Sequence, residues 1–344
     1  SSAGWWASKT FGRLKKNGAR SCKSSMPIPR LTFHPAGVTA VDTEYLRPGL
    51  DAAHIVVQRS RAIVVDTGTN ASVPLIVATL DELGLLPEAV DYVFLTHVHL
   101  DHAGGAGKLL QALPNAQAVL HPRGAPHMVD PTKLIAGSIA VYGAERFAEL
   151  YGEIVPFAAE RIIVTADLQR LTVGERIFEF VHTPGHALHH QAIVDHGANS
   201  IFTGDTFGIS YREFDTARGA YIMPTTTPTQ FDPQQLVASI DRLLAYAPQA
   251  LYLTHYSRVT DVQRLGEALK AQIAAFVGIA RDAEKSFRGE PGVATEPEVT
   301  PDEEALQARI RFGLRDYAFA TLRAHDCKLP DAEIDALLHG DFQL

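Results

Sequence analysis

Three imidazoles and one carboxylate occur within six residues of this chain, at His97, His99, Asp101 and His102. The apolar run Tyr92 to Thr96 directly before them predicts a buried strand, and a helix is predicted just after them. In extended backbone the side chains of His97 and His99 point to the same side, so their nitrogens could bind one metal ion. Asp101 and His102, at the turn into the helix, could reach a second ion. A histidine-rich surface turn is the alternative for any one of these residues alone, but the whole pattern favours a metal site.

Three more predicted strands end on residues of the same chemical kind. These residues are His186, Asp205 and His255, which follow the strands that begin at Arg176, Ile201 and Ala250. The full set of five imidazoles and two carboxylates suits zinc, iron or manganese by ligand type. The histidines outside these motifs are expected to be structural or solvated, and only His189 and His190 are left open.

Strands and helices alternate along the body of the chain. Strands are predicted at Ala53 to Gln58 and Ala62 to Asp66, and a helix at Val73 to Leu83, which gives a βαβ rhythm before the histidine cluster. A second mixed half follows, and in it Asp232 and the proline after it are the N-cap and first position of a predicted helix. The predicted fold class is therefore α/β.

The composition excludes several classes of protein. The chain has 344 residues, of which 46% are hydrophobic, and this is typical of a globular chain with a large core. No run approaches the ~20 apolar residues of a membrane-spanning helix. The two cysteines, Cys22 and Cys327, lie near opposite ends of the chain, so neither a disulfide framework nor a thiolate metal ligand is expected. The expected location is the cytoplasm.

Charge and pattern divide the chain into three regions. Residues 1–25 carry six basic residues and no acidic one, and we expect a disordered or artificial tail, with a native arm or an organelle presequence as alternatives. Residues 26–260 form the mixed α/β body. Residues 261–344 are predicted to be helical and to pack on the body or on a second copy of the chain, as in a homodimer. After the tail, 25 basic and 39 acidic residues give a formal charge of −14, which disfavours a nucleic-acid partner.

In this order the strand-end motifs resemble those of the metallo-β-lactamase superfamily of binuclear metallohydrolases, in its glyoxalase II and lactonase branch, over roughly Val38 to Tyr256. The resemblance implies an αββα sandwich with the metal ions at one edge of the two sheets and a C-terminal helical appendage. It implies two sets of metal ligands, His97, His99 and His186 for one ion, and Asp101, His102 and His255 for the other. It also implies that Asp205 bridges the ions and that Asp66 hydrogen-bonds metal ligands, with a plain turn residue as the alternative for Asp66.

The chemistry implied by the resemblance is hydrolysis of a small molecule by two divalent transition-metal ions. A bridging hydroxide would attack a carboxylic ester, lactone or thioester, while Asp101 helps to move a proton to the leaving group. The alternative is a mononuclear iron oxidoreductase of the persulfide-dioxygenase kind, and retention of the second set of ligands favours the hydrolase. A catalytically silent regulator is a third hypothesis, against which the intact ligands argue.

Substrate choice is expected to depend on the segment Phe207 to Phe231, which is long for a connection between a metal ligand and a capped helix. Tyr211, Arg218 and Tyr221 are the predicted substrate-binding residues in it. The alternatives are a surface excursion whose aromatic residues anchor it to the core, and a pocket built by other loops, such as the one around Pro126 to Ile139.

Overall fold

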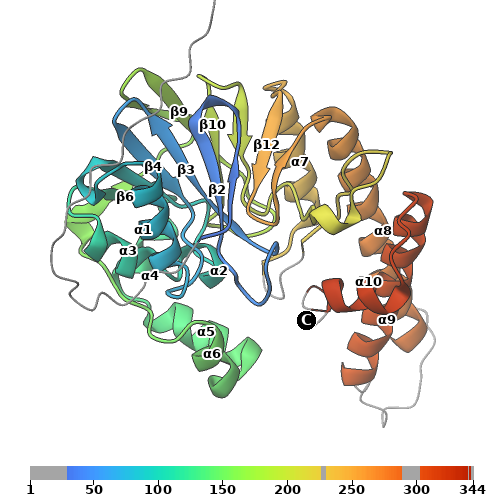
Figure 1. Cartoon of the computed structure of the whole chain (residues 1–344). Helices are drawn as coiled ribbons and strands as arrows, with labels where there is room; N and C mark the ends of the chain where they lie inside the picture. Colours follow the sequence, from blue (N-terminus) through green and yellow to red (C-terminus); the bar gives the residue numbers. More distant parts are fainter. Residues whose placement is uncertain (1–28, 226–229, 289–302, 340, 342–344) are drawn as a thin grey trace, which may run out of the picture.

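Two β-sheets pack face to face in the computed structural model, which describes residues 29–225, 230–288, 303–339 and 341. Helices cover the outer face of each sheet, so the layers run helix, sheet, sheet, helix (Figure 1). The predicted αββα sandwich with appended C-terminal helices is confirmed. Residues 1–25, the predicted basic tail, lie outside the described residues.

The first sheet is antiparallel over its first four strands and parallel from β4 onward. Its strands, in spatial order, are β1 (Leu31–Phe33), β2 (Val38–Asp42), β3 (Ala52–Gln58), β4 (Arg61–Val65), β5 (Val90–Phe94), β6 (Gln117–Leu120) and β7 (Ile162–Val164). The parallel pairs require helical crossovers, which the predicted βαβ rhythm supplies.

The second sheet is antiparallel except for the pair β11 and β12. Its strands, in spatial order, are β13 (Ser257–Val259), β12 (Ala250–Leu253), β11 (Ser200–Phe202), β10 (Gln191–Asp195), β9 (Arg176–His182) and β8 (Gln169–Val173). All three predicted strands that precede a ligand motif in this sheet, β9, β11 and β12, are therefore present, and β11 begins one residue before its predicted start.

Helices alternate with the strands and continue after the last one. The helices are α1 (Val73–Glu82), α2 (Leu100–Ala103), α3 (Ala106–Ala112), α4 (Ala125–Val129), α5 (Thr132–Tyr142), α6 (Ala144–Leu150), α7 (Pro233–Leu244), α8 (Val262–Arg288), α9 (Glu303–Ala324) and α10 (Asp331–Leu338). Among the described residues, no helix combines the length and the apolar character that crossing a membrane requires. The predicted cap of α7 is confirmed, because the Asp232 carboxylate accepts hydrogen bonds from the backbone N–H groups of Gln234 and Gln235, both at 3.0 Å.

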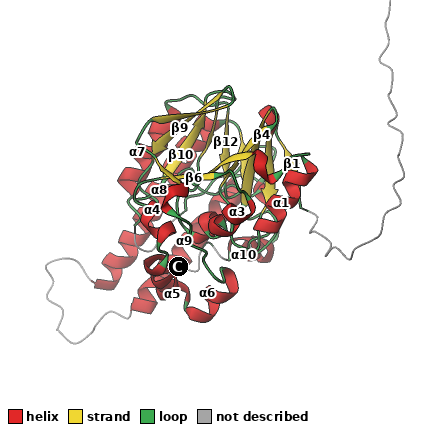
Figure 2. Ribbon diagram, turned by 90° about the vertical axis from the view of Figure 1, so that its left-hand side faces the viewer, coloured by secondary structure: helices red, strands yellow, loops and turns green. Residues whose placement is uncertain are grey.

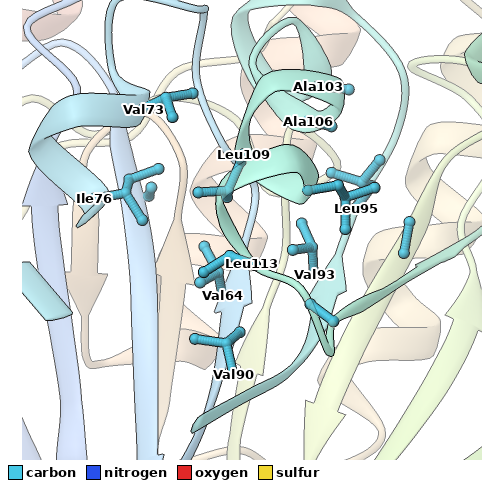
Figure 3. Packing of buried hydrophobic residues seen from close by; sticks show 14 of the residues in the cluster. Val64, Val73, Ile76, Val90, Val93, Leu95, Ala103, Ala106, Leu109 and Leu113 are labelled. Atoms are coloured by element: carbon cyan, nitrogen blue, oxygen red, sulfur yellow. The ribbon is translucent and has the colours of Figure 1, made fainter. Parts of the chain in front are cut away.

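Apolar side chains between the sheets and outside them hold the sandwich together. Between the sheets, the ring of Phe94 meets Phe178 and Phe180 edge to face, with centroids 5.4 and 5.0 Å apart. Outside the first sheet, Val64 and Leu109 belong to the cluster that packs α1 and α3 against the strands (Figure 3). Burial of each such large side chain contributes roughly 1.5–3 kcal/mol to the free energy of unfolding.

The two sheets are hydrogen-bonded to each other at one edge. The backbone N–H of Ala52 donates to the carbonyl of Thr254, and that of Gln191 donates to the carbonyl of Thr96, both at 2.8 Å. Such bonds satisfy backbone groups that strand pairing leaves free where the sheets meet. This edge, where β5, β9, β11 and β12 end, is the one at which the ligand motifs lie.

Helix α5 and the strands β1 and β2 were not among the predicted elements. Eight of the eleven residues of α5 are apolar, glycine or tyrosine, so its sequence lacks the alternation of apolar and polar faces by which a surface helix is recognised. In Figures 1 and 2, α5 and α6 project from the end of the molecule that carries the ligand motifs.

Candidate metal centre

The loop after β5 delivers four of the candidate ligands. His99 lies in extended backbone, and its carbonyl accepts hydrogen bonds from the first turn of α2, which carries Asp101 and His102. A Cβ at Gly105 would lie 2.5 Å from the carbonyl oxygen of Thr69, so only glycine lets the two loops approach this closely. The glycine thus serves close packing, and its φ is an ordinary −85°.

The first group consists of three histidines. The Nδ1 atom of His99 lies 2.9 Å from Nε2 of His97 and 3.1 Å from Nε2 of His186. His97 and His186 are buried, and His99 is partly exposed. Burial lowers the pKa of both His97 and His186 well below the ordinary histidine value. The charges of neighbouring histidines lower the pKa of His97 further. The rings are therefore neutral, and neutral nitrogens can bind a metal ion.

The second group brings a carboxylate to two further histidines. The Oδ2 atom of Asp101 lies 3.7 Å from Nε2 of both His102 and His255. Although burial alone would lower them, nearby carboxylates raise the pKa values of these two histidines well above the ordinary value. This half of the centre therefore attracts positive charge, which a proton or a metal ion can supply.

Asp205 lies between the two groups. Its Oδ2 atom is 3.2 Å from Nε2 of His186, while its Oδ1 atom is 3.1 Å from Nε2 of His102 and 3.3 Å from Nε2 of His255. One oxygen thus faces each group. Seven side chains from four strand ends converge on this point, as the sequence motifs would require of a binuclear site.

The buried polar atoms fit a pair of metal ions. Nε2 of His102 and Oδ1 of Asp205 are inaccessible to solvent, and although they lie 3.1 Å apart, neither makes a hydrogen bond. Leaving a buried polar atom without a hydrogen bond costs about 1–3 kcal/mol. Bound cations would satisfy both, and the nitrogen and oxygen donors are those that zinc, iron and manganese accept.

Asp66 anchors His102 from outside the cluster. Its Oδ2 atom lies 2.9 Å from Nδ1 of His102 and accepts a hydrogen bond from the hydroxyl of Thr254 at 2.9 Å. Its Oδ1 atom accepts from the backbone N–H of Thr96 at 2.9 Å. The carboxylate therefore orients a ligand ring and joins the ends of the two sheets.

Asp51 anchors His255 in the same way, and sequence reasoning did not find it. Its Oδ1 atom lies 2.5 Å from Nδ1 of His255, and the residue is fully buried. Burial raises the pKa of Asp51 to about 6, against the opposing effect of the His255 charge. A carboxylate on the outer nitrogen of a metal-binding imidazole fixes the ring and makes it a stronger ligand.

We expect the Asp51→Asn variant to bind the second metal ion about 10- to 100-fold more weakly than the wild type, because the neutral amide cannot polarise His255. Titration against a coloured chelator measures this loss directly. Asp42→Asn is the matched control, since Asp42, the last residue of β2, is also buried, but its carboxylate accepts hydrogen bonds from the backbone N–H groups of Glu44 and Gly49, both at 2.9 Å. Equal affinities in Asp51→Asn and wild type would remove Asp51 from the site.

Two residues outside the predicted set support the first group and the bridging position. The hydroxyl of Thr225 lies 3.0 Å from Nδ1 of His186. Nε2 of His190 accepts a hydrogen bond from the backbone N–H of Asp205 at 3.1 Å. The role of His190, which the sequence did not assign, is thus to hold the Asp205 backbone in place. Burial is the main cause that lowers the pKa of His190 well below the ordinary value.

The structure places two of the three predicted substrate-binding residues in the interior and the third at the surface. Tyr211 is 1% exposed, and its hydroxyl donates to Asp341 at 3.1 Å. The hydroxyl of Tyr221 is 2.7 Å from that of Thr321 on α9. Both hydroxyls thus anchor the segment to the C-terminal region, and a substrate role of Tyr211 and Tyr221 stays a prediction. Arg218 is exposed, and its substrate role stays a prediction.

Comparison with known proteins identifies one family. The model of the metallo-beta-lactamase superfamily matches residues 47–255. A metallo-beta-lactamase fold-containing protein of Sulfurisphaera tokodaii is 24% identical over 233 residues, which are 67% of this chain and 79% of that protein. A hydroxyacylglutathione hydrolase of Xanthomonas euvesicatoria is 31% identical over 186 residues, and the chain spans about half of that protein, 52%.

The fold has solved counterparts. A metallo-beta-lactamase family protein from Thermus thermophilus matches with a TM-score of 0.56 at 20% identity, covering 87% of this chain and 90% of that one. At this identity the likeness concerns the fold alone.

Proposed function

This chain belongs to the metallo-beta-lactamase superfamily of hydrolases, and on that premise we propose that it cleaves a carboxylic ester, lactone or thioester with two divalent transition-metal ions. The observation that carries the proposal is the position of Asp205, whose two oxygens face the two ligand groups separately. Its relatives include hydroxyacylglutathione hydrolase, which by its name acts on a thioester.

The residues divide the work of the reaction. His97, His99 and His186 would hold one ion, while Asp101, His102 and His255 would hold the other and Asp205 would bind both. The bound ions would polarise the substrate carbonyl and lower the pKa of water, so that hydroxide forms near neutral pH. Asp101, whose side chain is 22% exposed, can accept a proton and pass it to the leaving group. Asp66 and Asp51 keep His102 and His255 oriented.

Metal analysis and an activity screen on one preparation test the proposal. We expect close to two ions per chain after reconstitution with zinc, manganese or iron, and hydrolysis of at least one class among aryl esters, lactones and thioesters. Chelation should abolish turnover, and added metal should restore it, because no serine or cysteine nucleophile is part of the site.

Two results would contradict this function. Failure to take up any of the three metals would remove the metal centre. One iron per chain, with oxygen consumption and no hydrolysis, would replace the hydrolase with the mononuclear iron oxidoreductase.

A further inference from the structure

Three tyrosines gather beside Asp101, and the reaction as described above does not use them. The hydroxyl oxygens of Tyr45 and Tyr151 are 2.9 Å apart, and the ring centroids of Tyr142 and Tyr151 are 5.9 Å apart. Burial, and next to it the charge of Asp101, raises the pKa of the Tyr45 and Tyr151 phenols. The phenols are therefore uncharged and lie within the electrostatic range of the Asp101 carboxylate.

Apolar side chains connect these tyrosines to the turn that carries Asp101. Leu100, the residue before Asp101, is buried in one cluster with Tyr151 and Phe147 of the α6 region. Ile135 and Ile139 of α5 pack against the same cluster and are only partly buried. The helices α5 and α6 thus pack, through Leu100, on the turn that carries Asp101.

Helix α5 is apolar yet uncovered. None of its residues is buried, and Val141 and Tyr142 are each 47% exposed. A helix that is apolar around most of its circumference is normally enclosed by other groups. One side of α5 packs on the Leu100 cluster, and the described part of the chain leaves the rest of its apolar surface free for another molecule.

Charge decides which kind of molecule fits. The charged residues of α5 and α6 are all exposed, and they are Lys133, Glu145, Arg146 and Glu149. Arg146 is paired with Glu149 at 3.0 Å. None of these four residues belongs to the apolar cluster and their charges cancel, so the cluster itself offers no cation to an anionic group.

We propose that this surface, the tyrosine wall formed by Tyr45, Ile135, Ile139 and Tyr142 over the buried Tyr151, binds the uncharged apolar chain of the substrate. The inference rests on the proposed hydrolase function and narrows its substrate to neutral esters, thioesters or lactones with an apolar chain. Continuity with the turn that carries Asp101 argues for a substrate as the occupant. An anionic glutathione thioester would find no counter-charge there.

Chain length is the variable that tests the tyrosine wall. Two series of substrates are compared, p-nitrophenyl esters from acetate to octanoate and n-alkyl acetates from ethyl to octyl. We expect kcat/KM of the wild type to rise about two- to fourfold per methylene in at least one series, as burial of methylene groups predicts. In Tyr142→Ala and Ile139→Ala the ratio of kcat/KM between the longest and shortest members should fall by about four- to fifteenfold.

The control is Leu86→Ala. Leu86 is 72% exposed and precedes β5, at the end of the strand away from the ligands, so this variant should keep the wild-type ratio. An unchanged ratio in both wall variants would overturn the proposal. So would dissociation of a dimer by Tyr142→Ala without a change in the ratio, because α5 would then contact a second copy.

A binding measurement separates this inference from the hydrolase function. The probe is 2-nonanone, an uncharged ketone that resembles an ester but cannot be hydrolysed, titrated into the metal-loaded protein by calorimetry. Binding that weakens in Tyr142→Ala supports the wall even if no substrate is turned over. Turnover of short esters without binding of 2-nonanone keeps the function and rejects the wall.

Discussion

Replacing Asp205 with alanine is expected to lower kcat/KM by at least about a thousandfold. This loss exceeds the roughly 10- to 100-fold expected when a residue that hydrogen-bonds a metal ligand, such as Asp51, is replaced. The variant loses the group that faces His186 with one oxygen and His102 and His255 with the other. Two cations would then lie close together with no shared anion between them, so their repulsion increases. Metal content per chain should fall along with activity, and both are measured on the same sample.

Two control variants distinguish loss of activity at the metal centre from loss of the folded structure. Asp195 is also a fully buried aspartate, but it pairs with Arg176 at the far end of β10. Asp195→Ala should therefore reduce stability while two ions per chain remain. Asp205→Asn keeps the shape of the side chain and should retain the fold seen by circular dichroism. Full metal content and activity in both Asp205 variants would exclude the bridging role.

Asp101→Asn is expected to reduce kcat by about 10²- to 10⁴-fold, the range associated with loss of a positioned proton donor or acceptor. The loss should depend on the leaving group. An ester of p-nitrophenol, whose anion is a stable leaving group, needs little protonation and should lose less activity than an ester of an aliphatic alcohol.

This dependence separates the two roles proposed for Asp101. As a metal ligand alone, the residue would affect both esters equally, and the loss would follow the metal content. A loss that is the same for both leaving groups at full metal content would remove Asp101 from proton transfer. The His99 ring, which lies in the other group, provides a comparison, since His99→Ala should reduce metal content and act equally on both esters.

The elements of the sandwich were largely predictable because local signals and burial agree. β5 (Val90–Phe94) lies two residues before the predicted strand Tyr92 to Thr96, β9 begins at Arg176 as predicted, and the Asp232 cap begins α7. Each ligand motif directly follows a strand, so prediction of the strands also predicted that the motifs would share an edge.

Other features depend on contacts that leave no local pattern. Asp51 follows a turn and belongs to no motif, and it reaches His255 only because the backbone N–H of Ala52 is bonded to Thr254 of the other sheet. Tyr211 looks like a pocket residue in sequence, but α9 and α10 cover the segment to which it belongs. Helix α5 was missed because its apolar residues do not alternate with polar ones.

The hydrogen-bonded edge between the two sheets has a thermodynamic consequence. Ligands from the first sheet, such as His97, and from the second, such as Asp205, meet where Thr254 bonds to Asp66 and to Ala52. An ion held there cross-links the sheets in the folded chain only, so the free energy of unfolding rises with the free metal concentration. A hundredfold excess of metal over its dissociation constant adds about 2.7 kcal/mol per site. Metal supply would thus set how long the folded chain resists proteolysis, in addition to whether it can react.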